Sequence, residues 1–195
     1  LNDSEAKVIL VSNQVHFNKL MLVVSQLPKL ETIIYIKLDE VPGEITGKKI
    51  ISLDEVMGLG KDSKIVQVDV EPDDVASIVY TSGTTALPKG VMLTHNNFVF
   101  DAEASLTAVP VTHKDVLLSF LPLSHVLERT AGYYAPLVCR GSCIAYAESI
   151  KTLSQNLKEV KPTILVSVPR VFEKIHKNIW EKVKQGGGLK YKIFI

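Results

Sequence analysis

The residues best suited to chemistry lie together in one polar segment, residues 81–90. In order, they are Thr81, Ser82, Gly83, Thr84, Thr85, Ala86, Leu87, Pro88, Lys89 and Gly90. Glycines and short side chains allow backbone N–H groups to point inward, hydroxyl groups add donors, and a lysine supplies a compact positive charge. Such a segment can bind the phosphate groups of ATP. By composition alone, however, an ordinary polar surface turn is the commoner explanation.

The order of the residues distinguishes this segment from a Walker A loop. That loop contains a glycine, four further residues and then Gly-Lys-Ser or Gly-Lys-Thr at the start of a helix. Here Pro88 stands where the second glycine belongs, and Gly90 follows the lysine. We therefore expect a phosphate-binding loop of another type.

Residues 81–90 closely resemble the phosphate-binding signature of the acyl-adenylate-forming superfamily, also called the AMP-binding or ANL enzymes. The signature is Thr-Ser-Gly-Ser/Thr-Thr-Gly, any residue, then Pro-Lys-Gly, and a match of this length and composition is highly specific. One position departs from it, because the family usually has glycine where this chain has Ala86. An alanine in a positive-φ conformation costs on the order of 1 kcal/mol, so this residue can impair the geometry or the activity of the loop.

Three further segments extend the resemblance along the chain. Residues 121–129, Leu-Pro-Leu-Ser-His-Val-Leu-Glu-Arg, look like the second signature of the long-chain acyl-CoA synthetases. Residues 168–174 are similar to a third segment of that branch, and residues 94–97 fit the segment after the phosphate loop. The resemblance implies fatty acids rather than amino acids as substrates. It also implies that residues 1–195 are an internal part of the large AMP-binding domain, without the small C-terminal domain.

The resemblance implies a two-step reaction that uses ATP, Mg²⁺ and coenzyme A. A carboxylate attacks the α-phosphorus of ATP to give acyl-AMP and pyrophosphate, and the thiol of coenzyme A then displaces AMP to form a thioester. Because carboxylate and triphosphate repel each other, catalysis of the first step depends mainly on positioning and charge neutralisation.

Individual roles also follow from the resemblance, with His125 and Lys89 as the catalytic candidates. We expect Thr81 to contact phosphate and Mg²⁺, Lys89 to bind the β- and γ-phosphates, and His125 to lie beside the acyl carboxylate and the adenylate. The residues expected to cradle the phosphates are Ser82, Gly83, Thr84 and Thr85. Without the resemblance, the hydroxyls could equally cap turns, and His125 could be a core or helix-capping histidine. Glu128 and Arg129 are expected to form a plain ion pair on a helix surface.

Two other functions stay open. The family's magnesium-binding glutamate, ribose-binding aspartate and adenylation lysine belong to later segments, so we expect the isolated chain to bind nucleotide weakly without turnover. A non-catalytic nucleotide-binding or interaction fragment is therefore the second hypothesis. The third keeps the superfamily but changes the substrate to an aryl, short-chain or luciferin-like acid.

Composition and charge narrow the class of protein. Apolar residues make up 46% and charged residues 22% of the chain, which is typical of a folded globular protein. The formal net charge of +1 shows no basic excess, so we expect no nucleic-acid partner. The apolar stretch 131–147 is interrupted by Arg140 and Gly141, and a spanning helix needs roughly 18 uncharged residues. We therefore expect no transmembrane segment. Because no export signal is visible in the sequence, we also expect a cytoplasmic location, and peripheral membrane contact and a homodimer stay open.

The apolar patterns predict an α/β fold with layered, largely parallel sheets flanked by helices. Strands are predicted at residues 8–11, 33–36, 76–80, 90–93, 116–121, 144–145 and 163–168. Helices are predicted at residues 17–27, 53–57, 98–109, 123–137, 150–160 and from 169 to the glycines at 186–188. We expect Ser52 to cap the second helix and Asn96 or Asn97 to cap the third. The first two strands, joined by a helix, should be parallel, and the polar segment should be a loop between the third and fourth strands.

Overall fold

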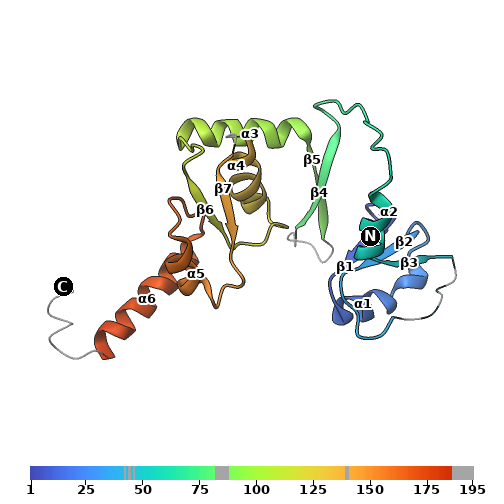
Figure 1. The fold of residues 1–195 in the computed structure, drawn as a ribbon, viewed down its shortest axis with the longest axis horizontal. Helices are drawn as coiled ribbons and strands as arrows, with labels where there is room; N and C mark the ends of the chain where they lie inside the picture. Colours follow the sequence, from blue (N-terminus) through green and yellow to red (C-terminus); the bar gives the residue numbers. More distant parts are fainter. Residues whose placement is uncertain (42, 44, 46, 82–87, 139–140, 186–195) are drawn as a thin grey trace. The chain divides into compact units, whose positions relative to one another are not determined.

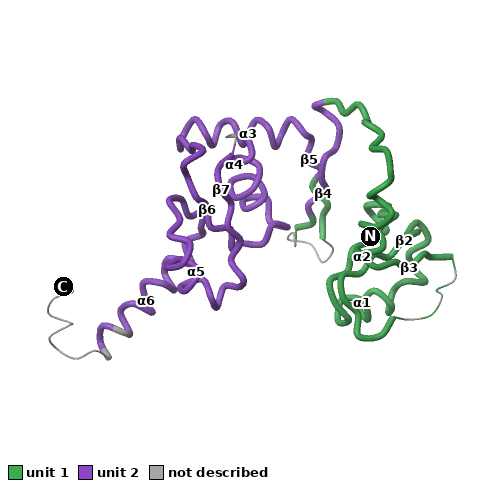
Figure 2. The backbone as a smooth tube through the Cα atoms, viewed as in Figure 1, with its two compact units in different colours: residues 1–71, 80–91 green, residues 72–79, 92–195 purple. Residues whose placement is uncertain are grey.

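The computed structural model describes residues 1–41, 43, 45, 47–81, 88–138 and 141–185. The chain divides into two compact units, residues 1–71 with 80–91 and residues 72–79 with 92–195 (Figure 2). Helices and strands alternate along most of the chain (Figure 1). This order confirms the predicted α/β class.

The sheet of unit 1 contains three parallel strands. They are ordered β1 (Val8–Val11), β2 (Thr32–Tyr35) and β3 (Lys49–Ser52). The parallel pairing of β1 with β2 confirms the prediction, and Ile33 of the central strand is fully buried. We did not predict β3, because its apolar run, Ile50-Ile51, is too short to stand out in the sequence.

Helix α1 (Gln14–Met21) packs on this sheet through its buried residues Phe17 and Leu20. Asn13 caps its N-terminus, because the side chain accepts a hydrogen bond from a first-turn backbone N–H. One longer helix was predicted here. Instead α1 ends early and a short 3₁₀ helix, η1 (Val24–Gln26), follows it.

Helix α2 (Leu53–Gly60) begins with the predicted cap. Ser52 Oγ accepts a hydrogen bond from the Glu55 backbone N–H at 3.1 Å. In return, Glu55 Oε2 accepts from the Ser52 hydroxyl at 2.6 Å and from the Ser52 backbone N–H at 2.9 Å. These bonds stabilise the carboxylate and lower the pKa of Glu55.

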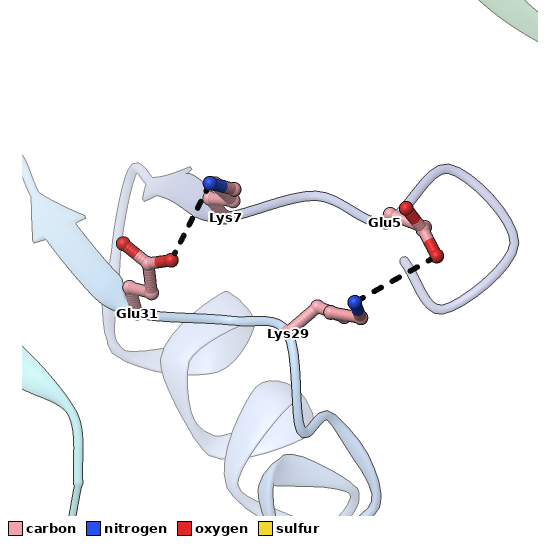
Figure 3. A network of polar contacts seen from close by, with 4 residues as sticks. All are labelled: Glu5, Lys7, Lys29 and Glu31. Carbon is pink, nitrogen blue, oxygen red and sulfur yellow. Dashed lines mark ion pairs between the residues drawn. The ribbon is translucent and has the colours of Figure 1, made fainter.

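Two ion pairs lie on the surface of unit 1 (Figure 3). Lys7 Nζ lies 3.7 Å from Glu31 Oε1, and Lys29 Nζ lies 4.0 Å from Glu5 Oε1. Such exposed pairs contribute little to stability, because water and salt screen them. The apolar core therefore holds unit 1 together. Its buried residues are Val11, Phe17, Leu20, Leu27, Leu30 and Ile33.

Strands β4 (Val75–Thr81) and β5 (Lys89–Thr94) were predicted as strands, and they pair in a two-stranded sheet. Only seven residues, 82–88, connect them. Parallel strands need a crossover of about a dozen or more residues, so β4 and β5 are antiparallel. The end of β4 and the start of β5 therefore lie at the same end of their sheet.

Helix α3 (His95–Ala108) directly follows β5 and has a capping box. Thr94 Oγ1 accepts a hydrogen bond from the Asn97 backbone N–H at 3.2 Å, and Asn97 Oδ1 accepts from the Thr94 backbone N–H at 2.9 Å. The cap is thus Thr94, and the prediction of Asn96 or Asn97 was wrong. Asn97 instead supplies the second half of the box.

Unit 2 also contains a parallel pair, β6 (Val116–Ser119) and β7 (Cys143–Tyr146). The strand predicted at 163–168 is reduced to one parallel bridge between Ile164 and β6. The Thr163 hydroxyl accepts a hydrogen bond from the first backbone N–H of β6 at 3.0 Å. A side chain thus occupies a position that a strand backbone would use in a regular ladder.

The helix predicted at 123–137 starts later and has a different form. Residues 122–125 form a turn, and the π-helix η2 (Glu128–Tyr134) leads into α4 (Ala135–Val138). The remaining helices, close to their predicted positions, are α5 (Leu153–Val160) and α6 (Pro169–Gln185). Among the described residues, no helix combines the length and apolar character needed to cross a bilayer.

Candidate functional site

Thr81 and Lys89 are the two predicted phosphate-binding residues that the structure describes. Thr81 ends β4 and Lys89 begins β5, so the antiparallel pairing brings both to one end of the sheet. Both residues are exposed. A hydroxyl and an ammonium group in this arrangement can contact an anion such as a triphosphate. The other predicted loop residues lie outside the described residues: Ser82, Gly83, Thr84, Thr85 and Ala86.

The residue before Thr81 is anchored to the N-terminal segment of unit 1. The Tyr80 hydroxyl donates a hydrogen bond to Asp3 Oδ2 at 2.6 Å. This bond stabilises the protonated phenol and is the main reason that the pKa of Tyr80 is raised. Sequence analysis did not single out Tyr80, because no local pattern links it to a residue so far along the chain.

His125 lies in the exposed turn before η2. Its backbone N–H donates to the Pro122 carbonyl at 2.9 Å, and the Leu127 backbone N–H donates to its Nδ1 at 3.3 Å. A ring nitrogen that accepts a hydrogen bond carries no proton, so the neutral imidazole has its proton on Nε2. His125 can therefore donate from Nε2 to a ligand oxygen. Its exposure excludes the alternative of a buried core histidine. The helix-capping alternative agrees with the structure, because Nδ1 accepts a first-turn N–H of the helical residues that begin at Val126.

The three described site candidates fall into two groups. Thr81 and Lys89 belong to unit 1, and the β4–β5 pairing brings them together. His125 belongs to unit 2. Its expected place beside the acyl carboxylate stays a prediction.

Arg129 and Glu128 do not form the expected ion pair on a helix surface. Arg129 is half-buried, and its Nη1 donates to Ser77 Oγ at 2.6 Å. Its Nε donates to the Leu123 carbonyl at 3.2 Å. The guanidinium thus binds two neutral acceptors on different segments, one of them in β4.

Glu128 is only 1% exposed and begins the π-helix η2. Its carboxyl group packs against Gly132, where an added Cβ would lie 2.5 Å from Oε1. The Ser119 side chain and the Phe120 backbone lie near the carboxyl, but neither oxygen makes a hydrogen bond of normal geometry within the described residues. Burial is the main cause that raises the pKa of Glu128, and the two polar neighbours oppose it in part. The neutral form of this carboxyl is therefore favoured.

Two of the hollows in the described part of the chain are well formed, and neither of them is lined by Thr81, Lys89 or His125. One of about 460 Å³ lies between α5 and α6, and one of about 490 Å³ lies beside β1 and α1. The described residues also contain no group of three or more His, Cys, Asp or Glu side chains that could hold a metal ion.

The chain belongs to the AMP-binding enzyme family, whose model matches residues 1–194. The match includes the polar segment 81–90 and the turn that contains His125. It confirms the family predicted from these motifs.

Relatives match nearly the whole chain but extend well beyond it. A human long-chain-fatty-acid–CoA ligase is 33% identical over 204 residues, which is 100% of this chain and 30% of the relative. A peroxisomal long-chain acyl-CoA synthetase from Arabidopsis thaliana is 33% identical over 184 residues, 91% of this chain and 26% of the relative. The chain therefore spans less than a third of the length of these relatives. Their names confirm the predicted resemblance to the long-chain branch.

Solved structures support the fold. A crystal structure of a long-chain-fatty-acid–CoA ligase from Archaeoglobus fulgidus has a TM-score of 0.72 and 28% identity, over 92% of this chain and 34% of that one. An anthranilate CoA ligase in complex with anthranoyl-AMP has a TM-score of 0.74 and 21% identity, over 88% of this chain and 32% of that one. The second similarity concerns the fold alone. Both agree with the predicted α/β class.

The contact between Glu128 and Gly132 predicts a specific mutational coupling. Gly132→Ala should lower the free energy of unfolding by about 1–3 kcal/mol, because the new methyl group overlaps a buried carboxyl that has little room to move. In a Glu128→Ala background the same change should cost much less. Urea unfolding of the four forms measures the coupling, and additive effects would contradict it.

Gly58→Ala is a matched control for this cycle. Gly58 lies in α2, and an added Cβ there meets no described atom within 4 Å. Alanine should therefore stabilise the chain by about 0.5–1 kcal/mol, as expected for a glycine in a helix interior.

The burial of Glu128 predicts a pH dependence of stability. Its pKa is raised above the ordinary value of 4.5, so the folded state holds the proton more tightly than the unfolded state. The resulting stabilisation is fully present below this ordinary value and is lost as the pH rises through the raised pKa. Glu128→Gln cannot ionise, so from acidic to mildly alkaline pH the variant should lose less stability than the wild type. Thermal unfolding across this range measures the difference, and parallel curves would contradict it.

Proposed function

We propose that the complete protein carrying this chain activates a long-chain fatty acid with ATP and then transfers it to coenzyme A. The observation that carries the proposal is the pairing of β4 with β5, which brings Thr81 and Lys89 to one end of a sheet in a chain of the AMP-binding family. The substrate class is supported by the names of relatives that match the chain from end to end, which are long-chain-fatty-acid–CoA ligases.

In the first step, a carboxylate oxygen of the fatty acid attacks the α-phosphorus of ATP. A bond forms between these two atoms, the bond from the α-phosphorus to the bridging oxygen of pyrophosphate breaks, and pyrophosphate leaves with that electron pair. Both reactants are negatively charged, so their repulsion raises the barrier. Lys89 lowers it by binding β- and γ-phosphate oxygens. The remaining hydrogen-bond donors come from Thr81, Ser82, Gly83, Thr84 and Thr85.

Magnesium fits the chemistry of this loop. The ion prefers oxygen ligands, and in nucleotide enzymes it is held by few protein oxygens together with substrate phosphates and water. In this chain, the exposed Thr81 hydroxyl is the proposed protein contact. When bound, the ion neutralises charge on the triphosphate oxygens.

His125 orients the fatty-acid carboxylate in this proposal. Its Nδ1 accepts the Leu127 backbone N–H, which leaves Nε2–H to donate to the carboxylate oxygen that does not attack. In the second step the thiol of coenzyme A releases its proton to water and the sulfur attacks the acyl carbon, and AMP leaves with the electron pair and the oxygen that linked it to the acyl group. The same Nε2–H can stabilise the charge that develops on the acyl oxygen.

The wider properties of the protein stay predictions from the sequence. They are a cytoplasmic location, peripheral contact with a membrane and a homodimer. A nucleotide-binding protein without turnover is the outcome that would replace the ligase proposal.

Substitution of Lys89 tests the role of the loop. In the complete protein, Lys89→Ala should lower pyrophosphate release from ATP and palmitate by about 100-fold or more, because one charged donor to the reacting phosphates is lost. Lys61→Ala removes an exposed lysine that follows α2 and should leave the rate unchanged. Equal rates in the Lys89→Ala variant and the wild type would exclude the loop assignment.

A further inference from the structure

Arg129 connects two segments that carry predicted site residues. Its Nη1 donates to Ser77 Oγ at 2.6 Å, in the strand that ends at Thr81. Its Nε donates to the Leu123 carbonyl at 3.2 Å, and its backbone N–H donates to the His125 carbonyl at 3.1 Å. The side chain of Arg129 thus binds β4 and the turn that contains His125.

Ser77, the residue of β4 that Arg129 contacts, lies on the same face of the strand as Thr81. Side chains alternate between the two faces of a strand, so Ser77, Val79 and Thr81 share one face. Ser77 and Val79 are half-buried, whereas Ile78 between them is exposed. At about 3.3 Å per residue, the bond at Ser77 lies roughly 13 Å along the strand from Thr81.

The turn that contains His125 is held by hydrogen bonds more than by packing. Residues 122–127 are exposed, so apolar burial does little to hold their conformation. Arg129 is half-buried, and hydrogen bonds from a charged donor are roughly twice as strong as neutral ones. The side chain of Glu128 is buried within unit 2. None of the ion pairs found among the described residues involves Arg129. Its donors are directed at Ser77 and Leu123 instead.

We infer that Arg129 is a positioning residue that fastens the His125 turn to β4, the strand that carries Thr81. The inference rests on the proposed function, because this link matters for turnover only if Thr81 and His125 act on the same substrates. The planar guanidinium directs Nε and Nη1 to two separate acceptors at once. A lysine has one nitrogen on a flexible stem and can keep at most one of these contacts.

A double-mutant cycle in the complete protein tests the link. Pyrophosphate release from ATP and palmitate is measured for the wild type, Arg129→Met, Ser77→Ala and the double variant. Methionine keeps much of the stem packing but removes the donors. Arg129→Met should lower kcat by about 10- to 100-fold, because misplaced catalytic groups slow the chemical step. KM for ATP should stay within about twofold, since Lys89 and its loop are intact.

Ser77→Ala should lower kcat by about 3- to 10-fold, the effect of one lost hydrogen bond. Both single changes break the same bond, so the double variant should match Arg129→Met. Arg129→Lys should recover only a small part of the loss. Lys158→Met, which removes an exposed cationic side chain of α5 outside the signature segments, should keep the wild-type kcat.

The outcomes separate this inference from the proposed function. A wild type without palmitate-dependent pyrophosphate release overturns the proposed function and the role of Arg129 with it. An active wild type overturns the inference alone if Arg129→Met keeps its kcat and loses only thermal stability, or if the two single effects multiply in the double variant.

Discussion

The antiparallel pairing of β4 with β5 positions the described residues of the predicted phosphate loop. A connection of only seven residues cannot cross over to form a parallel pair, so Thr81 and Lys89 must lie at one end of the sheet. Backbone hydrogen bonds of the two strands hold both ends of the connection.

Glu128 and Arg129 are adjacent in the sequence, but their side chains lie in different environments. The carboxyl of Glu128 lies in the interior of unit 2 against Gly132, where burial favours its neutral form. The guanidinium of Arg129 keeps its charge and binds neutral oxygens of two segments. They sit at the start of a π-helix, a form that occurs frequently at functional sites. The signature 121–129 therefore carries structural residues as well as His125.

Elements whose structure is determined by neighbouring residues could be predicted from local sequence patterns. The apolar run at 8–11, the Ser52 cap and the strands around the polar segment were all predicted from short stretches of sequence. The family and its long-chain branch followed from motifs of about ten residues. Thr81 and Lys89 were predicted in the loop, but they are the last residue of β4 and the first residue of β5.

The parts that sequence analysis missed depend on contacts between distant residues. β3 has a weak pattern of its own and forms by pairing with β2. The predicted strand at 163–168 is reduced to one bridge, and the Thr163 side chain also accepts a hydrogen bond from β6. Arg129 and Ser77 are 52 positions apart, so no local spacing indicates their bond. The burial of Glu128 likewise depends on the packing of η2 in unit 2, which a helix-surface pattern does not contain.

The most direct measurement is the identity of the products that the complete protein forms from Mg-ATP and palmitate without coenzyme A. We expect palmitoyl-AMP and pyrophosphate in equal amounts, with the acyl group passing to coenzyme A when the thiol is added. Benzoate and phenylalanine in place of palmitate should give far less adenylate. Release of ADP and phosphate, or nucleotide binding without any palmitate-dependent product, would contradict the assignment of this chain to a fatty-acid-activating ligase.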